Sequence, residues 1–197
     1  MKKQRVLVLD FGGQYKQLIA RNIRRWGVYS SIEPGDISID RIREEQPIGI
    51  ILTGGPNSVY SPQAPNCDPA LFGLGIPILG ICYGMQLMCH LLGGEVTPCD
   101  VSEYGQTVVE IDNSSPLFEG LARSETALMS HTDRVSRLPE GFEGIAETRD
   151  CEFAAIQNKE RQLYGVQFHP EVELTPNGKK LLYNFLYKIC GAEGDYS

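Results

Sequence analysis

A cysteine at position 82 stands where a nucleophile would, between an apolar run and a helical pattern. Residues 76–81 are apolar but too few for a stable helix, which is typical of a buried strand. From Gly84 the apolar residues recur at helical spacing until Gly93-Gly94 ends the pattern. A strand that turns sharply into a helix, with glycines two residues before and after the junction, indicates a nucleophile elbow. The sequence therefore predicts strained backbone at Cys82 and a helix N-terminus that favours its thiolate.

A second segment offers a base and an acid for this cysteine. A strand pattern over residues 163–168 leads into His169, and Pro170 favours extended backbone at the residue before it. Residues two apart in extended backbone face the same side, so Glu171 can hold the imidazole. With Cys82 they form the cysteine–histidine–acid set of acyl transfer, in which the imidazole activates the thiol and later protonates the leaving group. The alternatives are a buried structural cysteine and a loop histidine beside a solvated glutamate.

Attack on a carbonyl also needs donors for the developing oxyanion. Gly54 and Gly55 follow a predicted strand and offer unhindered N–H groups, although the pair could be only a tight turn. The N–H of Tyr83, directly after the nucleophile, is the usual second donor at an elbow. His131 ends a predicted strand with Asp133 two residues on, which makes it a candidate substrate contact and a second-ranked base.

The elements that must position these residues form an α/β pattern. Strands are predicted over residues 5–10, 28–32, 48–53 and 76–81, and helices over 14–26, 39–44 and 84–92, with a short one from 69. Continuous apolar strands in this order predict a mostly parallel central sheet with helices on both faces. Ligands bind beyond the carboxyl ends of such strands, where Asp10, Gly54-Gly55 and Cys82 all lie.

The second half of the chain predicts a smaller antiparallel extension of the sheet and a closing helix. Short strands with turn signals between them are predicted over 95–97, 107–111, 126–129, 144–147, 153–157 and 163–168. A final helix is expected over about 175–189. The domain is predicted to span residues 1–190, followed by a polar, loose tail over 191–197.

The composition excludes several classes of protein. A chain of 197 residues, 42% hydrophobic and 22% charged, fits one soluble domain. The net charge of −7 argues against a nucleic-acid partner, and no apolar run approaches the length of a membrane span. The six cysteines show no metal-type spacing with the three histidines, so we expect reduced thiols, no metal site and a cytoplasmic protein.

Three motifs together resemble the class I, or triad, glutamine amidotransferases: Gly80-Ile-Cys-Tyr-Gly-Met-Gln86, Thr53-Gly-Gly-Pro56 and His169-Pro-Glu171. The resemblance implies that family's flavodoxin-like fold. It also implies hydrolysis of the side-chain amide of L-glutamine through a γ-glutamyl thioester. Cys82 would be the nucleophile, His169 the base and acid, and Glu171 its orienting carboxylate. The resemblance assigns the oxyanion hole to Gly55 and Tyr83, and glutamine binding to Gly54, Gln86, Ser130, His131 and Asp133.

Finer features resemble the branch of this family that supplies ammonia for the conversion of XMP to GMP. They are Leu9-Asp-Phe-Gly-Gly-Gln-Tyr15, Met129-Ser-His-Thr-Asp-Arg-Val135 and Tyr164-Gly-Val-Gln-Phe-His-Pro-Glu171. That branch more often has serine in place of Gly13 and glycine in place of Thr132.

The resemblance implies a partner domain or subunit, namely an ATP-pyrophosphatase that aminates adenylylated XMP. This chain lacks a Ser-Gly-Gly-x-Asp-Ser pyrophosphate-binding loop, so ATP and Mg are expected only in that partner and no cofactor here. The tail resembles the junction to such a synthetase domain, which leaves an excised domain and a free-standing subunit both open.

Two other functions remain open at this point. One is the amidotransferase component of an anthranilate or aminodeoxychorismate synthase. Those families usually have Asp-Asn-x-Asp-Ser-Phe after the first strand, where this chain has Asp10-Phe-Gly-Gly-Gln. The other is a non-catalytic, flavodoxin-like binding module with an unused elbow.

Overall fold

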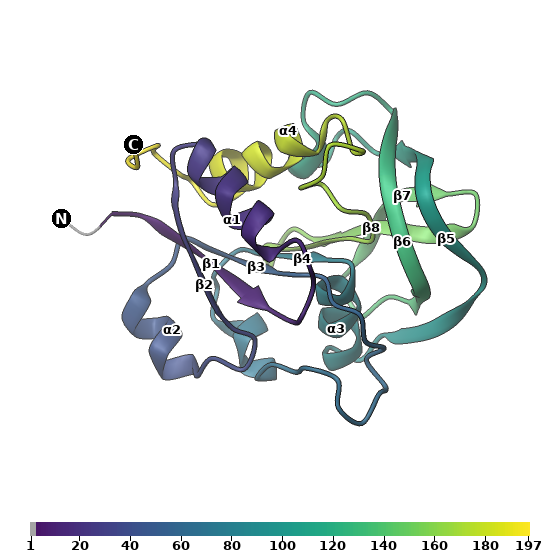
Figure 1. The fold of residues 1–197 in the computed structure, drawn as a ribbon, viewed down its shortest axis with the longest axis horizontal. Coiled ribbons are helices and arrows are strands. Elements are labelled where there is room, and N and C mark those ends of the chain that lie inside the picture. The colour runs from purple at the N-terminus through teal and green to yellow at the C-terminus, as the bar shows by residue number, and fades with distance from the viewer. Residues whose placement is uncertain (1–2) are drawn as a thin grey trace.

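The computed structural model describes residues 3–197; residues 1 and 2, where the predicted domain begins, lie outside the described part. The described chain folds around one nine-stranded sheet of order β2-β1-β3-β4-β9-β8-β7-β5-β6 (Figure 1). Its parallel half consists of β2 (Tyr29–Pro34), β1 (Arg5–Asp10), β3 (Gly49–Leu52), β4 (Ile78–Ile81) and β9 (Leu163–Val166). This is the flavodoxin-like, doubly wound strand order, so the predicted α/β architecture is confirmed.

Helices cover both faces of the parallel half, as predicted. On one face α1 (Lys16–Arg25) and α4 (Gly178–Tyr183) pack on Val6 and Val8 of β1. On the other face α2 (Ile39–Glu45), α3 (Tyr83–Leu91) and the 3₁₀ turn Pro69–Gly73 pack on Leu7 and Leu9. Figure 1 shows α1 and α4 above the sheet and α2 and α3 below it. The alternation of side chains along β1 thus feeds two separate hydrophobic cores.

The antiparallel extension is larger than predicted. It comprises β8 (Cys151–Asn158), β7 (Glu143–Thr148), β5 (Glu95–Ile111) and β6 (Ser124–Arg137). The prediction of short strands over 95–97, 107–111 and 126–129 was therefore wrong in extent. β5 and β6 pair along most of their length with an irregular register between Pro98 and Glu103, and many residues of this arm are exposed. Over residues 97–108 of β5 only Glu103 is buried, so hydrophobic alternation does not reveal this part of the strand.

The final helix begins later than predicted. Thr175 Oγ1 accepts a hydrogen bond from the N–H of Leu128 at 2.9 Å, which holds residues 175–177 in a turn against β6. Helix α4 starts at Gly178, where an added Cβ would lie 1.9 Å from the carbonyl oxygen of Pro170. A π-helical turn, Asn184–Ile189, continues α4 to the predicted end.

The tail over 191–197 is docked, so the expectation that it is loose was wrong. The N–H of Tyr196 donates to the carbonyl of Gly27 at 3.0 Å, and the Tyr196 ring lies 5.6 Å from that of Tyr29. The carboxylate of Asp195 accepts from the N–H of Gln4 at 3.0 Å. These contacts join the tail to the N-terminal side of the sheet.

All six cysteines are free thiols, as predicted. Within residues 3–197, every helix is too short or too polar to cross a membrane.

Candidate active site

The predicted elbow is present between β4 and α3. Cys82 has φ 53° and ψ −109°, a conformation that residues other than glycine rarely adopt. The flanking glycines make the turn possible, since a Cβ on Gly84 would lie 2.4 Å from the carbonyl oxygen of Leu52. A Cβ on Gly80 would lie 2.7 Å from the backbone nitrogen of Met85. Close backbone packing therefore presents the thiol at the N-terminus of α3.

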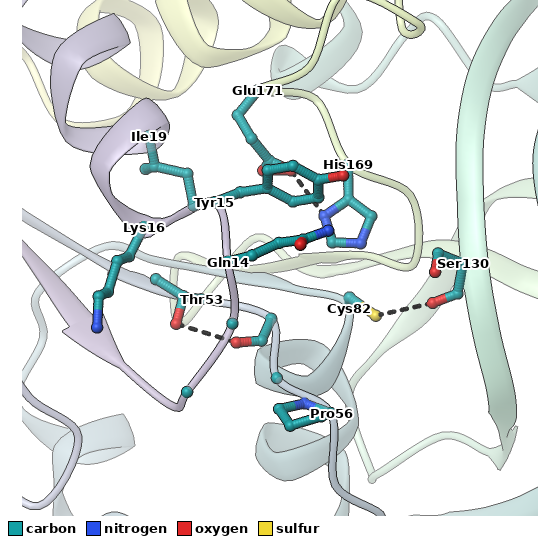
Figure 2. Close-up of a pocket in the computed structure, with 14 residues that line it drawn as sticks. Gln14, Tyr15, Lys16, Ile19, Thr53, Pro56, Cys82, Ser130, His169 and Glu171 are labelled. Carbon is teal, nitrogen blue, oxygen red and sulfur yellow. Dashed lines mark hydrogen bonds and ion pairs between the residues drawn. The ribbon is translucent and has the colours of Figure 1, made fainter.

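The structure brings His169 and Glu171 to this thiol. Nδ1 of His169 lies 2.7 Å from Oε1 of Glu171, and both residues are buried. Figure 2 shows the imidazole between Glu171 and Cys82. Since the carboxylate accepts the proton on Nδ1, Nε2 is left for exchange with the thiol. The His169 N–H donates to the carbonyl of Leu128 on β6 at 3.1 Å, which anchors the base, and the Tyr15 ring packs edge-on against the imidazole.

The surroundings favour a protonated His169. Burial lowers the pKa of His169, but hydrogen bonds with Cys82 and Glu171, together with their charges, raise it overall from 6.5 to about 10. An imidazolium next to sulfur stabilises negative charge on it. A protonated His169 can therefore stabilise negative charge on the sulfur of Cys82 and later supply a proton to a leaving group.

The glycines proposed for the oxyanion hole are required by close packing. A Cβ on Gly54 would lie 3.2 Å from Cε1 of His169 and 3.6 Å from Cβ of Cys82. A Cβ on Gly55 would lie 2.4 Å from the carbonyl oxygen of Phe11. The N–H of Tyr83, in the first turn of α3, is among those that lack an intrahelical acceptor. The locations of Gly55 and Tyr83 are compatible with N–H groups that donate to an oxyanion. That role stays a prediction.

Two cavities meet at Cys82. The larger, of about 360 Å³, lies against residues 12–16 and is also lined by Gly54, His169 and Glu171 (Figure 2). The smaller, of about 210 Å³, is lined by Tyr83 and Tyr104 and by four of the five predicted glutamine-binding residues: Gln86, Ser130, His131 and Asp133. Gly54, the fifth, lines the larger cavity.

The imidazole of His131 is engaged away from the nucleophile. Its Nδ1 donates to the carbonyl of Asp133 at 2.7 Å, and its Nε2 lies 2.9 Å from Oε1 of Glu103 on β5. The His131 side chain is 1% exposed. Because both ring nitrogens are occupied, the second-ranked interpretation of His131 as the base for Cys82 was wrong. Its role in binding glutamine stays a prediction. Because the ring is occupied, the backbone groups of His131 would make that contact.

Glu103, His131 and Cys151 place ligand-type atoms within 4.8 Å of one another. Hydrogen bonds already occupy Glu103: its Oε2 accepts from Oγ1 of Thr148 at 3.0 Å, and its Oε1 faces the imidazole. These contacts connect β5 to β6 and β7.

Gln167 is a further residue of the site and was not among the predicted ones. Its Nε2 donates to Sγ of Cys82 at 3.4 Å, and its Oε1 accepts from Nε2 of Gln86 at 3.0 Å. Sγ also donates to the carbonyl of Ser130 at 3.7 Å. Residues two apart in extended backbone face the same side, which is why His169 and Glu171 were paired. The same spacing places Gln167 on that side, so the sequence contained a pattern that indicates this residue.

Comparison with known sequences places the chain in a family. The model of the family described as glutamine amidotransferase class-I matches residues 7–189. A GMP synthase (glutamine-hydrolyzing) of Clostridium perfringens is 58% identical over 98% of this chain, and one of Acetivibrio thermocellus is 57% identical over 100%. The chain spans 38% of the length of each of these two relatives.

Solved structures agree with this assignment. A crystal structure described as that of a GMP synthase subunit from Thermoplasma acidophilum superposes with a TM-score of 0.81 at 33% identity, covering 96% of this chain and 95% of that one. A glutamine amidotransferase of Thermotoga maritima, at 20% identity, shares the fold with a TM-score of 0.76 over 98% of this chain and 100% of that one. With its elbow, its histidine–glutamate pair and these relatives, the chain belongs to the class I glutamine amidotransferases.

Proposed function

We propose that this chain hydrolyses the side-chain amide of L-glutamine and supplies the ammonia to a partner that aminates XMP. The observation that carries the proposal is the strained Cys82 at the N-terminus of α3 with the buried His169–Glu171 pair beside it. That arrangement is one for acyl transfer.

The chemistry follows from these positions. The thiolate of Cys82 attacks the amide carbon, and the N–H groups of Gly55 and Tyr83 stabilise the oxyanion. The imidazolium of His169 protonates the leaving nitrogen, the C–N bond breaks, and ammonia and a γ-glutamyl thioester form. His169, now neutral, takes a proton from water, which attacks the thioester. The C–S bond breaks, which restores the thiolate and imidazolium, and the new γ-carboxylic acid loses its proton to solvent as glutamate leaves. Glu171 keeps the imidazole oriented throughout.

We assign glutamine to the smaller cavity. Its side-chain amide would lie at Cys82, and its amino and carboxyl groups toward residues 130–133. The carboxylate of Asp133 is suited to an α-ammonium group, and the backbone of this segment to an α-carboxylate. Gly54 would not contact glutamine in this cavity. Its contribution is the absence of a side chain, which leaves room for the His169 imidazole.

The partner would be an ATP-pyrophosphatase domain or subunit that adenylylates and aminates XMP. Support comes from the two GMP synthases, which extend well beyond the matched region, and from the Thermoplasma structure, whose chain is nearly all matched. Fused and separate arrangements both occur among proteins similar to this one. ATP and Mg would belong to the partner, with no cofactor in this chain, and the setting would be cytoplasmic.

The test combines loss of function with labelling. Cys82→Ala should abolish release of glutamate from glutamine while the protein stays folded by circular dichroism. Diazo-oxo-norleucine, a glutamine-like electrophile, should label the parent once, at Cys82, as read by peptide mass spectrometry. Hydrolysis that survives in Cys82→Ala would sink the proposal. Absence of labelling even with a synthetase partner, ATP and XMP present would favour a binding module instead.

A further inference from the structure

Gln167 follows directly after β9 and stands two residues before His169 in the chain. Its side chain contacts the nucleophile. Gln167 is 0% exposed, and its Nε2 donates to Sγ of Cys82 at 3.4 Å. The mechanism above gives this contact no role. We propose that Gln167 is a further catalytic residue, which holds the Cys82 sulfur and stabilises it as a thiolate. This inference rests on the proposed function and deepens it.

The orientation of the Gln167 amide is fixed by its neighbours. The carbonyl of Asp133 can only accept, so Gln86, 3.0 Å away, must present its NH₂ group there. The same NH₂ group lies 3.0 Å from Gln167, which must therefore present its oxygen. The NH₂ group of Gln167 is then left for the sulfur of Cys82. Reversing the amide would set two donors against each other, so the contact with sulfur is a donated hydrogen bond.

This arrangement is anchored beyond Gln86. The carbonyl of Asp133 also accepts from Nδ1 of His131, whose Nε2 faces Glu103, and Glu103 in turn accepts from Thr148. One chain of buried hydrogen bonds thus connects β7, β5 and β6 to α3 and the nucleophile. Buried polar networks of this kind are costly to disturb, which makes the position of the Gln167 donor well defined.

Two polar groups at the sulfur have opposite preferences. The carbonyl of Ser130, at 3.7 Å, accepts a proton from the thiol but repels a thiolate. The N–H of Gln167 favours the thiolate. The ionisable group next to the sulfur is His169, with Glu171 behind it. When the thioester forms, sulfur loses its charge; when water attacks and the C–S bond breaks, sulfur leaves as thiolate and Gln167 again donates to it. The donor thus raises the thiolate population available for the first half-reaction and stabilises the leaving thiolate in the second.

The experiment measures the thiolate directly. Alkylation of Cys82 by iodoacetamide is followed by peptide mass spectrometry between pH 5 and 10 in the parent and in Gln167→Glu and Gln167→Met. Glutamate keeps the shape and the contact with Gln86 but replaces the N–H at the sulfur with a carboxylate oxygen, which repels a thiolate, whereas methionine removes both polar groups without adding a charge. In both variants we expect the pH of half-maximal alkylation to rise by about one unit. We expect kcat to fall about tenfold or more with KM within about threefold.

Gln157→Met is the matched control. Gln157 is also buried, and its amide also bridges two partners, Ser115 and Glu143, but far from the sulfur. It should keep the alkylation profile and kcat of the parent. Gln167 variants that keep both parental values would overturn the inference. If Gln167→Met fails to fold, Gln167→Leu, which is likewise uncharged and without an N–H, decides the matter. A parental protein without glutaminase activity even when a synthetase partner, ATP and XMP are present, but with the shift in alkylation, would refute the proposed function and leave the role of Gln167 at the sulfur supported.

Discussion

At the scale of single residues, the protonation of His169 links the active site to stability. The pKa of His169 is raised in the folded protein, where burial is outweighed by hydrogen bonds with Cys82 and Glu171, to about 10 from its ordinary 6.5. A raised folded-state pKa gives stability that is fully present below about pH 6.5 and is lost as the pH rises through 10. We therefore expect the advantage of the parent over His169→Gln in unfolding free energy to shrink between these values. Urea unfolding at several pH values measures it, and an advantage that stays constant would contradict the expectation.

Gly54 is a residue whose missing side chain matters. In Gly54→Ala the new Cβ would lie 3.2 Å from Cε1 of His169, so the imidazole must move by a few tenths of an ångström. Catalytic geometry tolerates little displacement, and we expect kcat for glutamine to fall about tenfold or more. Gly144→Ala, on β7, is the matched control. Its new Cβ would lie equally close to a ring, 3.1 Å from that of Phe153 on β8, but not to the catalytic base. Steady-state glutamate release in both variants checks this; equal rates would show that the contact with the base is unimportant.

The site shows what residue patterns reveal and what they leave out. Cys82, His169 and Glu171 were found because each depends on local spacing, at a strand end or two residues apart. The link between Gln86 and Gln167 was not found, since it joins side chains 81 positions apart and depends on how they point. Sequence spacing gives no measure of such orientation.

At the scale of elements, the elbow depends on how closely β3 approaches the start of α3. Gly84→Ala would place a Cβ 2.4 Å from the carbonyl oxygen of Leu52, a backbone atom that cannot move alone. We expect a loss of about 1–3 kcal/mol in unfolding free energy, together with loss of activity. Gly73→Ala, whose Cβ would meet nothing within 4 Å, should stay within about 0.5 kcal/mol of the parent. Urea denaturation of the pair measures the difference, and equal midpoints would contradict this account of the turn.

The parallel half of the fold was predictable because three of its strands, β1, β3 and β4, are short apolar runs with aspartate, glycine or proline at or beside one end. The full length of β5 and β6 was not, because the middle of this arm pairs distant segments and many of its side chains face solvent. The docked tail escaped prediction for a similar reason. Its composition is polar, but its order comes from contacts with Gln4, Gly27 and Tyr29, far away in sequence.

At the scale of the whole molecule, an apolar surface borders the smaller cavity. Tyr104 and Val108 on β5 and Leu174 after the His-Pro-Glu motif are 67%, 56% and 50% exposed. Gln106 joins them by donating to the carbonyl of Leu174 at 2.8 Å, and Tyr104 also lines the cavity. A partner that receives ammonia from Cys82 would gain from covering this mouth, because free ammonia is otherwise lost to solvent. We therefore expect the synthetase partner to contact this surface.

The coupling can be separated from glutamine hydrolysis itself. Val108→Glu places a charge on this surface without touching the triad, and should leave the glutaminase activity of the isolated chain unchanged. With an XMP-aminating synthetase, ATP and XMP, we expect amination driven by glutamine to fall about fivefold or more, while amination driven by added ammonia is unaffected. Arg43→Glu on the exposed face of α2, at the opposite edge of the sheet, is the control (Figure 1). The parent should also hydrolyse glutamine slowly alone and faster with the partner, since ammonia released without an acceptor is wasted. If Val108→Glu matched Arg43→Glu in every assay, the partner would have to approach the cleft from another side.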